Sequence, residues 1–182
     1  MIRIAVFALI SMPILWVSRR SLGHPASHGF FRFFAFEAIL ALMLLNAPGW
    51  FADPLGVLQL VSWFLLSLSL LFVVWGFALL RRLGGFSPAA EASPSFDWES
   101  TGRLVTTGIY GYIRHPMYSS LLFLAWGAVL KSVTIGSVLL GVAASLALTA
   151  TARSEEVENV ARFGHQYREY MGRTRRFVPF LY

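Results

Sequence analysis

Five long apolar runs constrain this chain more than any other feature of its sequence. They extend over about Ile4–Val17, Phe30–Phe51, Leu55–Leu80, Met117–Leu130 and Val133–Ala152. The chain is 57% hydrophobic and only 13% charged, which is about half the charge of an average soluble domain. The sequence therefore predicts an all-α integral membrane protein with five transmembrane helices.

The basic residues predict how these helices are oriented. All of the 15 lysines and arginines except Arg3 and Lys131 lie on the side reached after the first, third and fifth runs. The positive-inside rule then places the amino terminus outside and the carboxy terminus in the cytoplasm. We attribute the net charge of +6 to this topology, so we expect the lipid bilayer as a partner and no nucleic acid.

The chain is expected to form a single membrane domain over residues 1–182. Residues 1–83 would be a three-helix scaffold, residues 84–103 a cytoplasmic linker, and residues 104–182 a polar motif, a helical hairpin and a cytoplasmic amphipathic helix. The fourth apolar run is only about 21 Å long as a helix, whereas a full span needs about 20 residues. We therefore expect this helix either to begin near Tyr112 or to occupy a thin or sheltered position.

The central motif comprises residues 106–120, TTGIYGYIRHPMYSS. Pro116 is suited to the first turn of the fourth helix. Arg114 and His115 would then lie beside a helix amino terminus, where free N–H groups and the helix dipole favour a bound anion. The structural alternative is a cytoplasmic arginine beside a proline that starts a helix, with no bound ligand. The sequence pattern alone leaves both interpretations open.

Three carboxylates are candidates for function. Glu155 and Glu156 follow the last apolar run, and the hairpin would bring them back to the central motif, where one could bind ribose hydroxyls or balance a cation. Acidic residues in a first helical turn are the structural alternative. Glu37 lies inside an apolar run and is a candidate for substrate binding, or a residue that snorkels to the surface near Arg32.

The remaining polar residues give weaker indications of function. Glu158 and Arg162 are four residues apart on an expected helix and are predicted to pair. His24 and His28 have the spacing of a metal pair, but no further ligand type clusters with them, so we expect no metal site. The chain has no cysteine, which excludes disulfides, thiolate metal sites and a cysteine nucleophile.

Taken together, the two polar regions resemble the isoprenylcysteine carboxyl methyltransferases and the related phospholipid N-methyltransferases. That family shows G-x-Y-x-x-x-R-H-P-x-Y, then E-E, then F-G-x-x-Y-x-x-Y, and a closing R-F-x-P. Those positions are held here by Gly108, Tyr110, Arg114, His115, Pro116, Tyr118, Glu155, Glu156, Phe163, Gly164, Tyr167, Tyr170, Arg176, Phe177 and Pro179. The resemblance covers roughly residues 104–179.

The resemblance implies a membrane methyltransferase that holds S-adenosylmethionine at the cytoplasmic face of a cell membrane, bacterial or archaeal, and methylates a lipid-like or small apolar acceptor. A carboxylate acceptor is favoured, and Arg173 or Arg176 would orient it. For an amine or thiol acceptor, His115 or a glutamate would remove the proton. It implies donor contacts from Gly108, Tyr110, Arg114, His115, Pro116, Tyr118, Glu155, Glu156, Tyr167 and Tyr170.

Two other functions stay open at this point. Sterol reductases share a similar membrane architecture but use a nicotinamide cofactor, and they are usually longer. A non-catalytic scaffold of the same fold is the other alternative. The sequence does not identify the acceptor or the oligomeric state.

Overall fold

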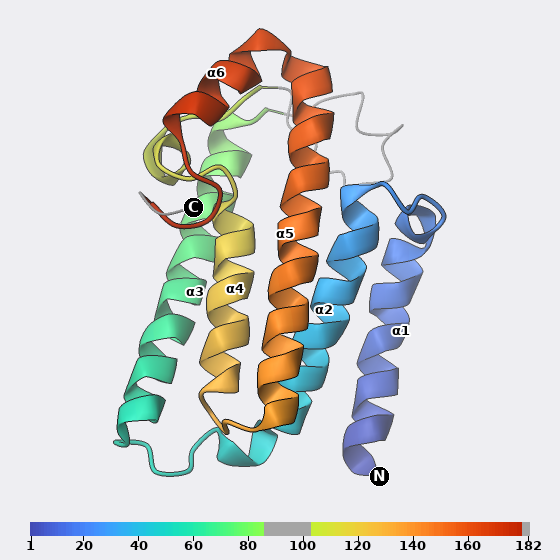
Figure 1. Cartoon of the computed structure of the whole chain (residues 1–182), viewed down its shortest axis with the longest axis vertical. Coiled ribbons are helices and arrows are strands. Elements are labelled where there is room, and N and C mark those ends of the chain that lie inside the picture. The colour runs from blue at the N-terminus through green and yellow to red at the C-terminus, as the bar shows by residue number, and fades with distance from the viewer. Residues whose placement is uncertain (86–102, 180–182) are drawn as a thin grey trace.

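The computed structural model describes residues 1–85 and 103–179 (Figure 1). Its helices are α1 (Ile2–Leu22), α2 (His28–Leu45), α3 (Val57–Leu83), α4 (Pro116–Val129), α5 (Ile135–Phe163) and α6 (His165–Arg173). Two short 3₁₀ turns, η1 and η3, cover Ala47–Gly49 and Gly108–Gly111. The all-α prediction is confirmed for these residues, and most of the predicted linker lies outside them.

Four helices are long and apolar enough to cross a membrane, namely α1, α2, α3 and α5. The fourth apolar run forms α4, which has only 14 residues and is shorter than a full span. The structure thus supports a membrane protein, while five spans and the orientation stay predictions.

The helices pack as a bundle in which α2 lies against α5 and α3 against α4, while α1 packs mainly on α2 at the edge (Figure 1). Small residues allow α4 and α5 to approach closely, as they do in many membrane helix pairs. A Cβ atom added at Gly141 of α5 would lie 2.8 Å from the Cγ2 atom of Val129. A larger residue at position 141 would force the Val129 side chain to shift.

Helix α4 begins at Pro116, as the sequence predicted, and not near Tyr112. Its far end is sheltered by polar side chains from α3 and from the end of α2. Ser62 donates to the carbonyl of Gly127 at 2.7 Å, and the Asn46 side chain donates to that of Ala128 at 2.7 Å. Because hydrocarbon offers no hydrogen bonds to the free carbonyls of a helix end, these contacts allow a short helix to end inside the bundle.

The turn after α4 is held by a buried lysine. Lys131 Nζ donates to Gln59 Oε1 at 2.9 Å and lies 3.4 Å from the centroid of the Trp63 ring. Gln59 in turn donates from Nε2 to the Lys131 carbonyl at 3.3 Å. A cation with an aromatic face and a hydrogen-bond acceptor is compensated for its loss of water. This contact joins the turn between α4 and α5 to α3.

The carboxy-terminal region contains two helices, where the sequence predicted one continuous amphipathic helix. Helix α5 continues from the membrane to Phe163, and Gly164 then adopts a φ of +59°. Only glycine adopts such a conformation without strain, so the chain turns here and α6 crosses the end of the bundle (Figure 1).

We expect replacement of Ser62 by alanine to destabilise the protein by about 1 kcal/mol, because the Gly127 carbonyl would lose its buried partner. Thermal unfolding in detergent measures the effect. Ser67→Ala is the matched control, because Ser67 is an exposed serine of the same helix. Equal melting temperatures for the two variants would contradict the sheltering role of Ser62.

Candidate functional site

The two polar regions meet at the end of the bundle opposite the amino terminus (Figure 1). Glu156 of α5 accepts from Arg114 Nε at 2.8 Å and from Arg176 Nη2 at 2.7 Å. The Glu156 side chain is only 6% exposed. Two guanidinium groups therefore hold a buried carboxylate, and the three residues form an ion cluster beneath the site.

Backbone hydrogen bonds place the closing segment, residues 174–179, beside the central motif. Arg114 N donates to the Arg175 carbonyl at 2.8 Å, and His115 N donates to the Arg176 carbonyl at 3.1 Å. Arg175 N donates to the Tyr112 carbonyl at 3.0 Å. This short parallel pairing satisfies backbone groups that the helices leave free, so the motif and the closing segment form one unit.

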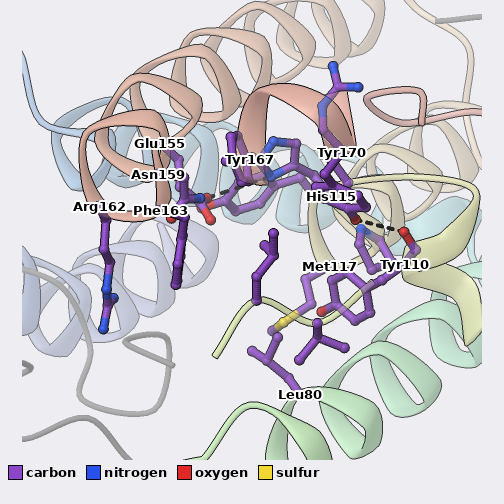
Figure 2. Close-up of a pocket in the computed structure, with 15 residues that line it drawn as sticks. Leu80, Tyr110, His115, Met117, Glu155, Asn159, Arg162, Phe163, Tyr167 and Tyr170 are labelled. Atoms are coloured by element: carbon purple, nitrogen blue, oxygen red, sulfur yellow. Dashed lines mark hydrogen bonds and ion pairs between the residues drawn. The ribbon is translucent and has the colours of Figure 1, made fainter. Parts of the chain in front are cut away.

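A pocket lies above this cluster. Figure 2 shows side chains of α5 along one side and side chains of the central motif along another, with tyrosines of α6 between them. The lining combines two arginines, a carboxylate, a histidine and several aromatic rings with apolar side chains. The lining residues are Leu80, Leu104, Val105, Tyr110, Arg114, His115, Pro116, Met117, Tyr118, Glu155, Asn159, Arg162, Phe163, Tyr167 and Tyr170.

Among the described residues, His115 has a buried ring nitrogen, Nε2, without a well-aligned hydrogen bond. Its ring is buried and stacks on Tyr118 with centroids 5.4 Å apart. Nε2 lies 3.4 Å from Glu156 Oε1 without the alignment of a hydrogen bond, and Nδ1 lies 3.7 Å from Glu155 Oε2. A buried polar atom without a partner is costly, so His115 is suited to bind a ligand here.

Tyrosines of α6 cover the pocket. Tyr170 donates from its hydroxyl to the Tyr110 carbonyl at 2.7 Å, and the Tyr167 and Tyr170 rings are 5.7 Å apart. Burial raises the pKa of both hydroxyls above the ordinary value for tyrosine. They therefore stay neutral, and the pocket offers them as ring faces and hydrogen-bonding groups.

The structure brings most of the predicted site residues together at one end of the bundle. Those that line the pocket are Tyr110, Arg114, His115, Pro116, Tyr118, Glu155, Tyr167 and Tyr170. Glu156 and Arg176 lie in the ion cluster. Gly108 has a φ of +61°, and a Cβ atom there would lie 2.6 Å from Leu79 Cδ1, so it shapes the chain and does not line the pocket.

Two predicted site residues lie elsewhere. Arg173 is 67% exposed and pairs with Glu169 of the same helix at 3.5 Å. Glu37 accepts from the Ser11 hydroxyl at 2.6 Å, between α1 and α2. It does not snorkel to the surface, because this partner lies inside the helix pair. Neither residue lines the pocket.

A family model of phospholipid methyltransferases matches residues 57–165, which is more than half of the chain. The chain belongs to the phospholipid methyltransferase family. The matched residues extend from α3 through the central motif and α4 to the end of α5. No curated protein and no solved structure matches the chain. The resemblance seen in the sequence is confirmed, and a membrane methyltransferase is supported.

Three residues of α5 that line the pocket were not predicted to contact a ligand. They are Asn159, Arg162 and Phe163. They lie four, seven and eight residues after Glu155, on the same face of the helix. This helical spacing from Glu155 could have predicted that they line the same pocket. The predicted pair of Glu158 with Arg162 does not form, because Glu158 binds His28 instead.

We expect Glu156→Ala to destabilise the protein by about 3–5 kcal/mol, because it removes the buried carboxylate that the guanidinium groups of Arg114 and Arg176 both bind. Thermal unfolding in detergent, without added ligand, measures this. Glu169→Ala is the control, since it removes an exposed partner of Arg173 and should change stability little. A Glu156→Ala variant as stable as the control would show that the ion cluster is not structural.

Proposed function

We propose that this protein transfers a methyl group from S-adenosylmethionine to the amine of a phospholipid headgroup at the cytoplasmic face of a membrane. The observation that carries the proposal is the pocket in which His115 has spare hydrogen-bonding capacity beside the Glu155 carboxylate and a group of buried tyrosines. Most of its lining lies in the region that matches the methyltransferase family.

The residues of the pocket fit the chemical groups of this donor. Glu155 offers negative charge to an ammonium or sulfonium group. The amino terminus of α4, with His115 beside it, offers N–H groups to a carboxylate. The faces of Tyr118, Tyr167 and Tyr170 offer stacking surfaces to an adenine ring and attract cations. When bound, the donor would supply an electrophilic methyl group on a positively charged sulfur.

The two arginines that the resemblance assigned to a carboxylate acceptor are engaged elsewhere. Arg176 is already bound to Glu156, and Arg173 is exposed and paired with Glu169. Neither supports the role of orienting a carboxylate. A pocket lined by Glu155 and aromatic rings suits a cationic headgroup better, which agrees with the description of the family.

Methyl transfer to an amine is an in-line displacement. The nitrogen lone pair forms the new bond to carbon, the electrons of the carbon–sulfur bond stay on sulfur, and the proton lost from nitrogen passes to a base. His115, whose ring lies between the Glu155 and Glu156 carboxylates, would take that proton. The further contribution of the protein is alignment of the two reactants and exclusion of water.

An apolar groove beside the pocket suits the tail of a lipid acceptor. It follows α4 from Ser119 to Leu130, has a volume of about 390 Å³, and is bounded by Phe177 at the pocket end. The Phe177 ring lies 6.3 Å from the His115 ring, measured between centroids. A lipid tail in this groove would bring its headgroup toward His115.

We expect S-adenosylhomocysteine to bind the detergent-purified protein in a calorimetric titration, and Glu155→Gln to weaken that binding because it removes the pocket carboxylate. Glu169→Gln, which removes an exposed carboxylate of α6, should bind as the wild type does. No binding by a folded wild-type protein would overturn the proposed donor.

The acceptor is tested separately with labelled S-adenosylmethionine and vesicles. We expect label to appear in phosphatidylethanolamine, and none in a fatty acid supplied in the same vesicles. Label in the fatty acid alone would restore the carboxylate acceptor and contradict the amine.

A further inference from the structure

The connection between α1 and α2 is docked on the carboxy-terminal part of α5. Glu158 Oε2 lies 2.7 Å from His28 Nδ1, and the His28 backbone N–H donates to Glu158 Oε1 at 3.3 Å. One turn earlier, Ser154 donates to the Ala26 carbonyl at 2.5 Å. We call these contacts, made by Ala26 and His28 with Ser154 and Glu158, the α5 clamp.

The connection itself is well ordered by local contacts. Ser27 caps α2, accepting from Phe30 N at 3.3 Å, and its hydroxyl donates to the Ser21 carbonyl at 3.3 Å. His28 is the first residue of α2 and is buried, with a relative exposure of 5%. Burial and the cap of α2 thus hold the His28 ring against Glu158.

The faces of α5 show why the clamp matters for the pocket. Successive residues of a helix are rotated by about 100°. Ser154 and Glu158 therefore share the face that meets the clamp, while Glu155 and Asn159 share the next face, which lines the pocket. Glu156 points to the ion cluster on a third side. A small rotation of this part of α5 would move Glu155 away from His115.

We propose that His28 and Glu158 are positioning residues of the donor pocket, which fix the rotation of α5 so that Glu155 and Asn159 face the ligand. The inference rests on the proposed function, because it assumes that the pocket binds the donor. His28 and Glu158 do not line the pocket, so they act through α5. His28 also lies outside the residues that match the family.

The test compares two histidines of the same connection. His28→Ala removes the ring that holds Glu158, whereas the His24 ring is exposed and, among the described residues, hydrogen-bonds only the Arg20 carbonyl, at 3.1 Å. We expect His28→Ala to weaken S-adenosylhomocysteine binding about tenfold or more, with a melting temperature near that of His24→Ala. Hydrogen exchange should accelerate in residues 153–160 and not in α3.

A second pair of variants distinguishes a loss of positioning from general unfolding. Glu158→Gln keeps one oxygen for the His28 backbone N–H, and its amide NH2 can donate to Nδ1 in the other tautomer of the His28 ring. This variant should bind nearly as the wild type does, whereas Glu158→Ala should lose binding as His28→Ala does. Equal binding by Glu158→Gln and Glu158→Ala, or unchanged binding by folded His28→Ala, would overturn the positioning role while leaving the proposed function intact. No binding by the wild type would overturn the proposed function and, with it, the role of the clamp.

Discussion

The buried carboxylate of Glu156 is the interaction on which the rest of the site depends. It is bound by Arg114 of the central motif and by Arg176 of the closing segment, and Arg114 also donates to the Thr174 carbonyl at 2.5 Å. Segments that are far apart in the sequence thus converge on one pair of oxygen atoms. Because none of these charges is well exposed to water, each requires the others, and the base of the pocket is fixed as a unit.

The opposite end of α4 is held by a different kind of contact. There the partners are neutral hydrogen bonds from Asn46 and Ser62, with Lys131 held by Gln59. A helix too short to reach both membrane surfaces is in this way anchored at both ends. The amino terminus of α4, and with it His115, is consequently held at a defined depth in the bundle.

The sequence was sufficient for the helices and for the meeting of the two polar regions, because apolar runs and the position of Pro116 determine both. It was not sufficient to distinguish Glu155 from Glu156. Adjacent residues of a helix point in different directions, but only the rotation of α5 decides which one lies in the pocket and which one binds Arg114. The break at Gly164 was missed for a related reason, since hydrophobic spacing continues through it.

That rotation depends on residues inside and outside the matched region. The residues that match the family include most of the pocket, yet the face that α5 turns toward it is also set by His28, which comes from the unmatched residues 1–56. Helix α5 has an ion pair on one face, an ion cluster on another and the pocket between them. One rotation of the helix satisfies all three. The amino-terminal helices are therefore more than a membrane anchor: they help to determine that Glu155, and not a neighbour, faces His115.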